Sequence, residues 1–399
     1  MKTLLICGYF ETQYQTEVLS KTKSFFNAAA NIFQERLIQG LRQFDLKIIS
    51  APFLSPYPTG YKDMYFNGFS NDANSDITYI PFNNTWGYRN ISRMANLKKE
   101  VKKFIHTYPT EKKSIIVYSV HTPFLEAAVY AKQLDPSIHI CMVTLDLPQY
   151  MNLNKNNRFI YDCFKKMDIK RFYKLNKCID SYVLLTRDMA DMLSVGERPY
   201  VVVEGIAEPK LMAPIARVGS GKKIAYAGKL VESFGVKNLL DAFALIKDKD
   251  AVLDICGDGE LAVYVTEQAR KDPRIHYHGT VSAQKSYEIL RNSDILINPR
   301  PNNEVYTKYS FPSKNIEYLQ TGNKVIAYML DGIPEVYKEF FVIPTDDTVV
   351  GLRDAILQCF EMSTTEQENK YRAFQTYVKN LFPLEVADKI KKLLLNEEK

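Results

Sequence analysis

The chain contains two successive series of short apolar runs separated by helix-length segments, and this pattern constrains its fold most. In the first half, Ser114–Val120 and Ile138–Thr144 are almost continuously apolar, and Leu125–Leu134 between them predicts a helix. The other elements expected in this half are strands at Thr3–Cys7, Lys47–Ser50, Ser181–Thr186 and Tyr200–Val203, and a helix at Asn27–Phe44. Strands without polar alternation are buried on both faces, so the series predicts a parallel sheet covered by helices on both sides.

The second half repeats the pattern and predicts a second doubly wound domain. Its strands are expected at Lys223–Ala227, Val252–Cys256, Ile275–Tyr277, Ile295–Asn298, Lys324–Ala327 and Phe341–Ile343, and a helix broken near Pro383 is expected over Thr365–Leu395. We divide the chain into an N-terminal domain (1–205), a C-terminal domain (206–375) and a C-terminal helix (376–399) that crosses back to the first domain. The fold class is α/β with two Rossmann-like domains, which bind ligands in the cleft between them, at the carboxyl ends of strands.

Composition and residue spacing indicate a cytoplasmic protein without a bound metal. No apolar run approaches the ~20 residues that span a bilayer, and Met1–Phe10 is better explained as a first strand than as a signal peptide. The 6 cysteines stand alone, as free thiols do in a reducing compartment, and neither they nor the 5 histidines have metal-ligand spacing.

The stretch Tyr309–Gly322 predicts a helix whose start can hold an anion. Ser310 is placed to cap the first turn, and Pro312 fixes φ where a helix has no need of an N–H group. Gly322 then ends the helix before the next buried strand.

The charge pattern of this helix start suits a nucleoside diphosphate. The N–H groups of Ser313 and Lys314, together with the helix dipole, favour a phosphate. Glu317 follows about one turn later and can accept hydrogen bonds from a ribose diol. An ordinary capped helix with a solvated glutamate fits the local pattern equally well.

Three further loops follow strands of the second half, where such a fold binds ligands. Gly228 and Lys229 combine a small residue with a cation, which suits a diphosphate, although a plain β–α turn has the same composition. Gly257 and Gly259 form a lone G-x-G, which also occurs in simple tight turns. Arg300 follows the fourth strand.

Six segments between Lys223 and Glu335 resemble the retaining glycosyltransferases of family 4, which have the two-Rossmann GT-B fold. They occur in the order of that family: Ala227–Leu230, Ile255–Gly259, His278–Gly279, Ser293–Arg300, Phe311–Glu317 and Asp331–Glu335. Phe311–Glu317 has the F-P-S-K-x-x-E form common among polysaccharide-assembly enzymes. The first half is similar more loosely, at Val120–Pro123, Asp146–Pro148, Asp180–Met189 and Val203–Ile206.

The resemblance implies sugar transfer from a nucleotide-diphosphate sugar to a glycan or lipid-linked acceptor, with retention and without a metal or other cofactor. The implied donor-binding residues are Gly228, Gly257, Gly259, Arg300, Ser310, Phe311, Pro312, Ser313, Lys314 and Glu317. The implied catalytic residues are Lys229, which stabilises the leaving diphosphate, and His121 and Asp146, which follow strands of the first domain.

Two departures from the family pattern leave other functions open. Tyr309 stands where the family usually has a glutamate, and Phe234 stands where it often has a lysine. The glycine-rich loop expected after the first strand is also absent. The alternatives are a nucleotide-sugar 2-epimerase of the same fold, which needs no acceptor, and a protein that binds a sugar nucleotide without catalysis.

Residues 154–180 form a basic segment with interleaved aromatic residues. They contain eight lysines and arginines against three aspartates, and Lys166, Lys170, Lys174 and Lys177 recur at helical spacing. Such a helix can lie on an anionic membrane, which leaves contact with the inner face of the plasma membrane open, or it can be a solvated helix of the first domain. No nucleic-acid motif accompanies the charge, so no nucleic-acid partner is expected.

Overall fold

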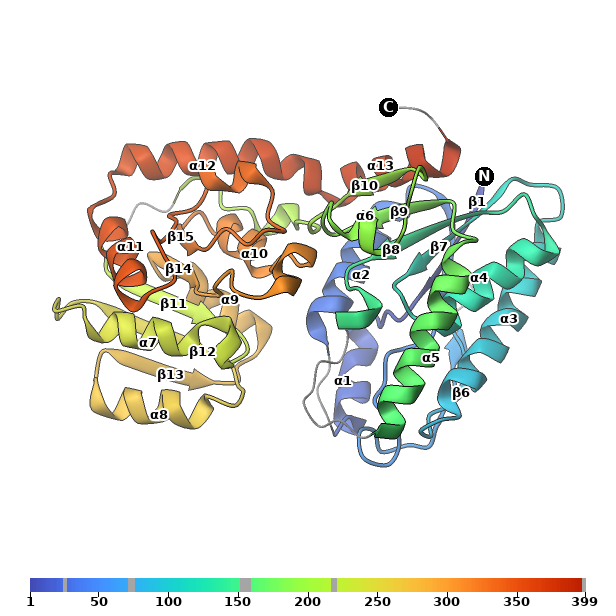
Figure 1. Cartoon of the computed structure of the whole chain (residues 1–399), viewed down its shortest axis with the longest axis horizontal. Coiled ribbons are helices and arrows are strands. Elements are labelled where there is room, and N and C mark those ends of the chain that lie inside the picture. The colour runs from blue at the N-terminus through green and yellow to red at the C-terminus, as the bar shows by residue number, and fades with distance from the viewer. Residues whose placement is uncertain (24–26, 71–75, 151–158, 217–220, 397–399) are drawn as a thin grey trace. The chain divides into compact units, whose positions relative to one another are not determined.

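The computed structural model describes residues 1–23, 27–70, 76–150, 159–216 and 221–396 (Figure 1). They form two compact units. The first comprises Met1–Ile206 and Leu381–Lys399, and the second comprises Ala207–Asn380.

The first unit is built on an eight-stranded sheet with the order β10-β9-β8-β7-β1-β2-β5-β4. Its parallel strands are β1 (Lys2–Cys7), β2 (Asp45–Ser50), β5 (Ile77–Tyr79), β7 (Lys113–Tyr118), β8 (His139–Thr144), β9 (Ser181–Leu184) and β10 (Tyr200–Val202), and β4 (Phe69–Ser70) is antiparallel at one edge. The predicted parallel sheet is confirmed, with strand bounds within about two residues of the expected ones.

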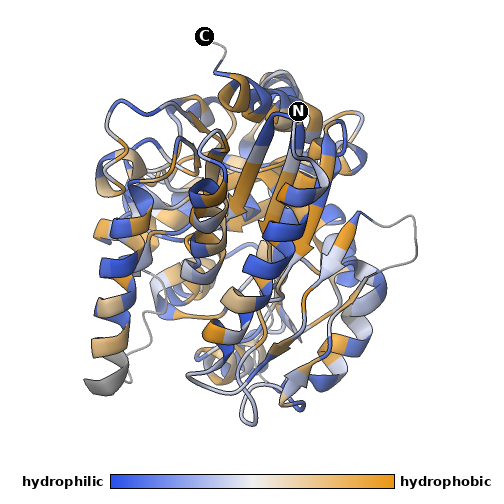
Figure 2. Cartoon of the chain, turned by 90° about the vertical axis from the view of Figure 1, so that its right-hand side faces the viewer, coloured by the Kyte–Doolittle hydropathy of each residue, from blue (hydrophilic) through white to orange (hydrophobic). Residues whose placement is uncertain are grey.

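Helices cover both faces of this sheet because its strands are apolar on both sides. One layer is α2 (Ala28–Leu41) with α13 (Pro383–Leu395), whose side chains share a buried cluster with alternate residues of β1, β2, β7 and β8. The other layer contains α3 (Arg89–Thr107), α4 (Thr122–Leu134) and α5 (Phe159–Asn176). Figure 2 shows the hydrophobic strands of this unit beside helices that carry hydrophilic residues.

Several elements of the first unit were not expected from the sequence. They are the helices α1 (Thr12–Lys21), α3 and α6 (Met189–Met192), the strands β4 and β5, and the antiparallel pair β3 (Tyr65–Phe66) and β6 (Phe82–Asn83).

The second unit has a five-stranded parallel sheet with the order β13-β12-β11-β14-β15. The strands are β11 (Lys223–Ala227), β12 (Val252–Cys256), β13 (Ile275–Gly279), β14 (Ile295–Asn298) and β15 (Lys324–Ala327). The helices are α7 (Val236–Ala244), α8 (Ala262–Lys271), α9 (Ala283–Arg291), α10 (Lys314–Gln320), α11 (Val349–Glu361) and α12 (Thr364–Val378).

The sixth strand expected at Phe341–Ile343 is wrong. Val342 makes one isolated parallel bridge to Ile326 and nothing longer. Pro344 follows at once and has no N–H group with which to extend a ladder. The break near Pro383 is confirmed, since α12 ends at Val378 and Pro383 begins α13.

Candidate functional site

Two glycine loops touch each other at the carboxyl edge of the second sheet. Gly228 follows β11, and its N–H group donates to the Cys256 carbonyl at 2.9 Å. Gly257 has φ +137°, and a Cβ atom there would lie 1.7 Å from the Gly228 carbonyl oxygen. Gly259 has φ +157°, and a Cβ atom there would lie 2.3 Å from the Leu230 carbonyl oxygen. Only glycine fits at these two positions, because a side chain at either would separate the two loops.

Lys314 brings its charge to the same turn. Its ammonium group donates to the Ala227 carbonyl and would lie 2.2 Å from a Cβ atom on Gly228. Burial lowers the Lys314 pKa to about 8, and neighbouring Glu317 opposes this shift. The Lys314 side chain therefore binds the turn after β11, which is far from it in sequence.

The prediction that Ser310 caps this helix is wrong. The helix α10 begins at Lys314, its N-cap residue is Ser313, and no side chain caps it. Ser310 ends the preceding 3₁₀ turn, Val305–Tyr309, and its hydroxyl accepts a hydrogen bond from Arg300 at 3.2 Å. The chain between Ser310 and Lys314 is thus a connecting segment and not a first turn.

Arg300 is held between two aromatic rings. Its guanidinium carbon lies 5.3 Å from the centroid of Phe234 and 5.1 Å from that of Tyr306. Its Nε atom is buried without a hydrogen-bond partner, and burial lowers its pKa from the usual value. A guanidinium keeps its charge at neutral pH even so.

Phe234 therefore has a role that the sequence did not reveal. It ends a 3₁₀ turn, Glu232–Phe234, and is followed by Gly235 with φ +75°. A Cβ atom on Gly235 would lie 2.0 Å from the Pro299 carbonyl oxygen, so the two loops are in direct contact. The residue that departs from the family pattern supports a cation from the neighbouring loop.

Backbone and side-chain bonds hold the loop that carries Arg300. Asn302 donates to the Asp331 carboxylate at 2.7 Å and accepts from the Asp331 N–H at 3.2 Å. Thr307 also donates to the Asn302 side chain, at 2.7 Å. A Cβ atom on Gly332 would lie 2.6 Å from the Ser310 carbonyl oxygen, so this loop packs closely on residues 331–332.

Two further residues that the sequence analysis missed connect α10 to the strand ends. The Tyr318 hydroxyl accepts from the Ala227 N–H at 3.0 Å and lies 3.2 Å from the Ala227 carbonyl. Asn298, at the end of β14, donates to the Asn315 side chain at 2.7 Å, and both are buried. Their positions next to Glu317 and Pro299 in the motifs were the available signal.

The remaining residues predicted for the site in the second unit differ in their surroundings. Lys229 is exposed, and its carbonyl accepts a hydrogen bond from Tyr226 at 2.9 Å. Glu317 is half-buried one turn into α10, whereas Pro312 and Ser313 lie in the connecting segment. Phe311 is buried against Tyr337, with the ring centroids 5.1 Å apart, so its side chain anchors the segment.

The two candidate residues of the first unit lie at the carboxyl ends of β7 and β8. His121 is the N-cap residue of α4 and packs edge-on against Phe53 and Phe124, at 5.4 and 4.7 Å between ring centroids. Its Nε2 atom is buried without a hydrogen-bond partner. Burial holds the His121 pKa well below its usual value. Asp146 follows β8 by two residues and is exposed.

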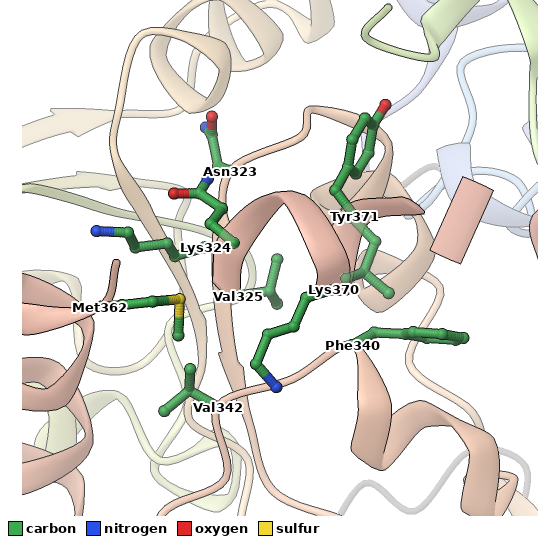
Figure 3. A pocket seen from close by; sticks show the side chains of 10 residues that line it. Asn323, Lys324, Val325, Phe340, Val342, Met362, Lys370 and Tyr371 are labelled. Carbon is green, nitrogen blue, oxygen red and sulfur yellow. The ribbon is translucent and has the colours of Figure 1, made fainter. Parts of the chain in front are cut away.

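Figure 3 shows a small cavity elsewhere in the second unit. It is lined by Lys324, Asn323 and Lys370, among others, and its volume is about 10 Å³, enough for about one water molecule. Lys324 begins β15, so the cavity lies at the opposite edge of the sheet from the glycine loops. It is too small for a nucleotide.

A metal cluster and a membrane-spanning helix are both absent from the residues that the structure describes. Within them, no three histidine, cysteine, aspartate or glutamate side chains are arranged to hold a metal ion. No helix in the same ranges is long and apolar enough to cross a membrane.

Comparisons with known proteins agree with this architecture. Residues 221–362 match the family described as "Glycosyl transferases group 1". Curated protein sequences gave no match.

Three solved structures are similar over nearly all of the chain. Sucrose-phosphate synthase from Thermosynechococcus elongatus is 13% identical, with 99% of each chain covered and a TM-score of 0.63. A glycosyltransferase from Rickettsia africae is 14% identical, with 100% of this chain and 99% of that one covered and a TM-score of 0.64. HepE of Anabaena, solved with UDP, is 13% identical, with 100% of each chain covered and a TM-score of 0.60.

At such low identities the structural likeness shows the fold alone, and the family match concerns residues of the second unit. The glycine loops, Lys314 and Arg300 all lie within the matched residues. The chain has the GT-B fold, and its residues 221–362 match the group 1 glycosyl transferase family.

Proposed function

We propose that the protein transfers a sugar from a nucleoside-diphosphate donor to a glycan or lipid-linked acceptor, with retention and without a metal ion. The observation that carries the proposal is the edge of the second sheet, where two touching glycine loops meet Lys314 and contact the loop of Arg300. The UDP bound to HepE, which has the same fold, supports a nucleotide in such a site.

In this mechanism the cations take over the charge of the departing diphosphate. Lys229 follows β11, Lys314 begins α10 and Arg300 follows β14. Contacts within the folded chain hold Lys314 and Arg300 before the sugar leaves. Preorganised charges of this kind stabilise a transition state more than a ground state. Gly257 and Gly259 let the backbone approach the nucleotide, and Glu317 accepts hydrogen bonds from the ribose. His121 and Asp146 of the first unit serve the transfer step.

Glu317→Ala tests the nucleotide assignment. We expect the affinity for UDP or another nucleoside diphosphate to fall about 10- to 100-fold, because each hydrogen bond to a carboxylate contributes ~1.5–3 kcal/mol. Glu317 is half-buried, so the free energy of unfolding should change little. Calorimetric titration of both proteins with UDP, GDP, ADP and dTDP provides the measurement.

An unchanged affinity for every nucleotide would remove Glu317 from the site. Product analysis of the wild-type protein with donor sugar, with and without acceptor, then tests the reaction itself. An epimerised donor formed without acceptor would contradict transfer, and binding without any product would contradict catalysis. Activity that disappears in chelator and returns with manganese would contradict the metal-free mechanism.

The pKa of Lys314 predicts a pH dependence of donor binding. Because this pKa is about 8, the free protein loses the ammonium charge as the pH rises above that value. We expect nucleotide affinity to be constant below about pH 7 and to fall roughly tenfold per pH unit well above pH 8. Binding at pH 8 should also take up part of a proton, seen as a buffer-dependent enthalpy in calorimetry.

Lys314→Arg is the matched control, because a guanidinium stays charged throughout this range. Its affinity should depend little on pH. A wild-type affinity that stays flat up to about pH 9.5 would show that the lysine charge does not contribute to binding.

We further propose that α5 contacts an anionic membrane surface that presents the acceptor. Lys166, Lys170 and Lys174 are exposed along one side of α5. Phe164 and Met167 beside them are 55% and 65% exposed, and Trp86 packs on Phe164 with 6.0 Å between ring centroids. Exposed aromatic residues next to cations are typical of interfacial helices.

The other residues of this segment fit the proposal less well. Phe172 is buried in the first unit and is not available to a membrane, and the charge of Arg171 is paired with Glu126 of α4. Lys155 and Arg158 lie outside the described residues.

Liposome co-sedimentation tests the membrane proposal. Each cation near an anionic surface contributes about 1 kcal/mol, so charge reversal of Lys166, Lys170 and Lys174 should reduce binding by two orders of magnitude or more. Trp86→Ser should weaken binding at high salt, where apolar contacts persist. The same reversal at Lys98, Lys99 and Lys102 of α3 is the control for total charge. Absence of binding at every anionic lipid content would overturn the proposal.

A further inference from the structure

Two arginines of α3 hold the short segment that follows β2. Arg93 donates from Nη2 to the Pro52 carbonyl at 2.5 Å, and Arg89 donates from Nη1 to the Leu54 carbonyl at 3.0 Å. The two arginines are one helical turn apart, so they reach the segment from the same side of α3. The backbone on both sides of Phe53 is therefore fixed.

Phe53 passes this constraint to His121. Its ring lies edge-on to the imidazole, at 5.4 Å between centroids, and also 5.4 Å from the ring of Phe124. The imidazole is thus enclosed by one ring from its own helix and one from the pinned segment. Phe53 itself is 38% exposed, so its position depends more on the pinned backbone than on core packing.

Stability alone does not account for Arg93. Its side chain is 2% exposed, its Nε atom has no hydrogen-bond partner, and it forms no ion pair among the described residues. The ring of Phe82, 4.2 Å from the guanidinium carbon, offsets part of the cost. A buried charge without a carboxylate generally lowers stability relative to an apolar side chain of similar size.

We propose that Arg89 and Arg93 are positioning residues that hold Phe53 against His121, so that the imidazole keeps one orientation at the start of α4. The proposal rests on the function proposed for His121 in sugar transfer. It adds a supporting layer, Arg89, Arg93 and Phe53, that no motif of the sequence indicates.

The same layer sets the charge state of the imidazole. Burial lowers the His121 pKa most, and the charges of Arg93 and then Arg89 lower it further. These arginines are the charged groups that act on His121 from α3, whereas Phe53 and Phe124 carry no charge. His121 is therefore neutral, and one of its nitrogens can accept a hydrogen bond from a hydroxyl. Since the unfolded chain binds the proton more readily, His121 costs stability as the pH falls below about 6.5.

The experiment compares Phe53→Leu, Arg93→Met and the double variant, with Lys99→Met as the control. Lys99 is an exposed cation of the same helix. Three quantities are measured in each protein: the titration of His121 by NMR of ¹³C-labelled histidine, assigned with His121→Gln, the rate of sugar transfer, and the donor affinity.

We expect the imidazole of the wild type to titrate well below the usual range of histidine and to titrate at higher pH in all three variants. Transfer should slow about tenfold or more with donor affinity unchanged, as a small misplacement of a reacting group does. The double variant should resemble either single variant, because both substitutions interrupt one chain of contacts. The control should match the wild type in every measurement.

Additive effects of the two substitutions, or an unchanged His121 titration in both single variants, would overturn the proposal. A slower transfer with unchanged titration would also overturn it, since the arginines would then act by another route. If the wild type transfers no sugar at all, the proposed function fails, and the NMR titration alone decides whether this layer positions His121. If Arg93→Met does not fold, Phe53→Leu and Arg89→Met provide the same comparison.

Discussion

Gly257→Ala should lower the rate of sugar transfer by at least about 100-fold. It should also lower the free energy of unfolding by about 2–4 kcal/mol. The added Cβ atom would lie 1.7 Å from the Gly228 carbonyl oxygen. The two loops must therefore move apart to accommodate it. Gly257 also has φ +137°, which an alanine rarely adopts. Separation of the loops would move Gly228 away from the Lys314 ammonium group.

Urea unfolding and donor turnover of the two proteins measure the two losses. Gly196→Ala is the matched control, because Gly196 also has a positive φ, +62°, and a Cβ atom there meets nothing within 4 Å. It should cost about 1–2 kcal/mol of stability and leave transfer intact. Wild-type turnover in Gly257→Ala would show that the contact between the loops does not form the site.

The sheets could be predicted because buried parallel strands leave a direct trace in the sequence. Runs such as Ser114–Val120 and Ile138–Thr144 have no polar alternation, and the structure places β7 and β8 there. The strands that were missed, β3 to β6, have two or three residues each, too few for any periodicity. The segment Phe341–Ile343 was predicted as a strand because it is apolar, but it forms only one isolated bridge to the sheet.

The glycine loops could be located from the sequence, but their contacts could not. That Gly228 and Gly257 follow strands was sufficient to place them at one edge of a parallel sheet. Their contact depends on β11 and β12 being neighbours, which the order of strands along the chain does not determine. The direction of the Lys314 side chain was hidden for the same reason, since its partner Ala227 is 87 residues away.

Ser310 illustrates how a local rule was overruled by a tertiary contact. A serine shortly before a proline and a helical run is a reasonable N-cap candidate. The Ser310 hydroxyl instead accepts from Arg300, and the helix begins four residues later. From the sequence, Phe234 indicated only that a lysine of the family pattern is missing. Its contact with Arg300 could not be predicted, because the two residues lie in loops that are far apart in the sequence.

Arg300→Met should lower kcat/KM for the donor by about 100-fold or more, because it removes one preorganised charge from the leaving diphosphate. Loss of a single such group in other enzymes costs ~2.7–4 kcal/mol of transition-state stabilisation. Methionine keeps an apolar stem between Phe234 and Tyr306, so stability should change little. The wild-type arginine is half-buried, and burial of its guanidinium lowers its pKa, so any change in stability should be a small gain.

A second substitution, at Phe234, can restore a positive charge near the position of the lost guanidinium. Phe234→Lys in the Arg300→Met background places an ammonium group where the ring now lies, 5.3 Å from the position of the guanidinium. We expect this double variant to recover about tenfold of the lost kcat/KM. Phe234→Lys alone should impair the enzyme, because two cations would then share a site from which the ring has been removed. Steady-state kinetics and nucleotide affinity of the four proteins test this expectation. If Arg300→Met retained wild-type turnover, or if the double variant were no better than Arg300→Met, the guanidinium would be a structural charge that does not act on the diphosphate.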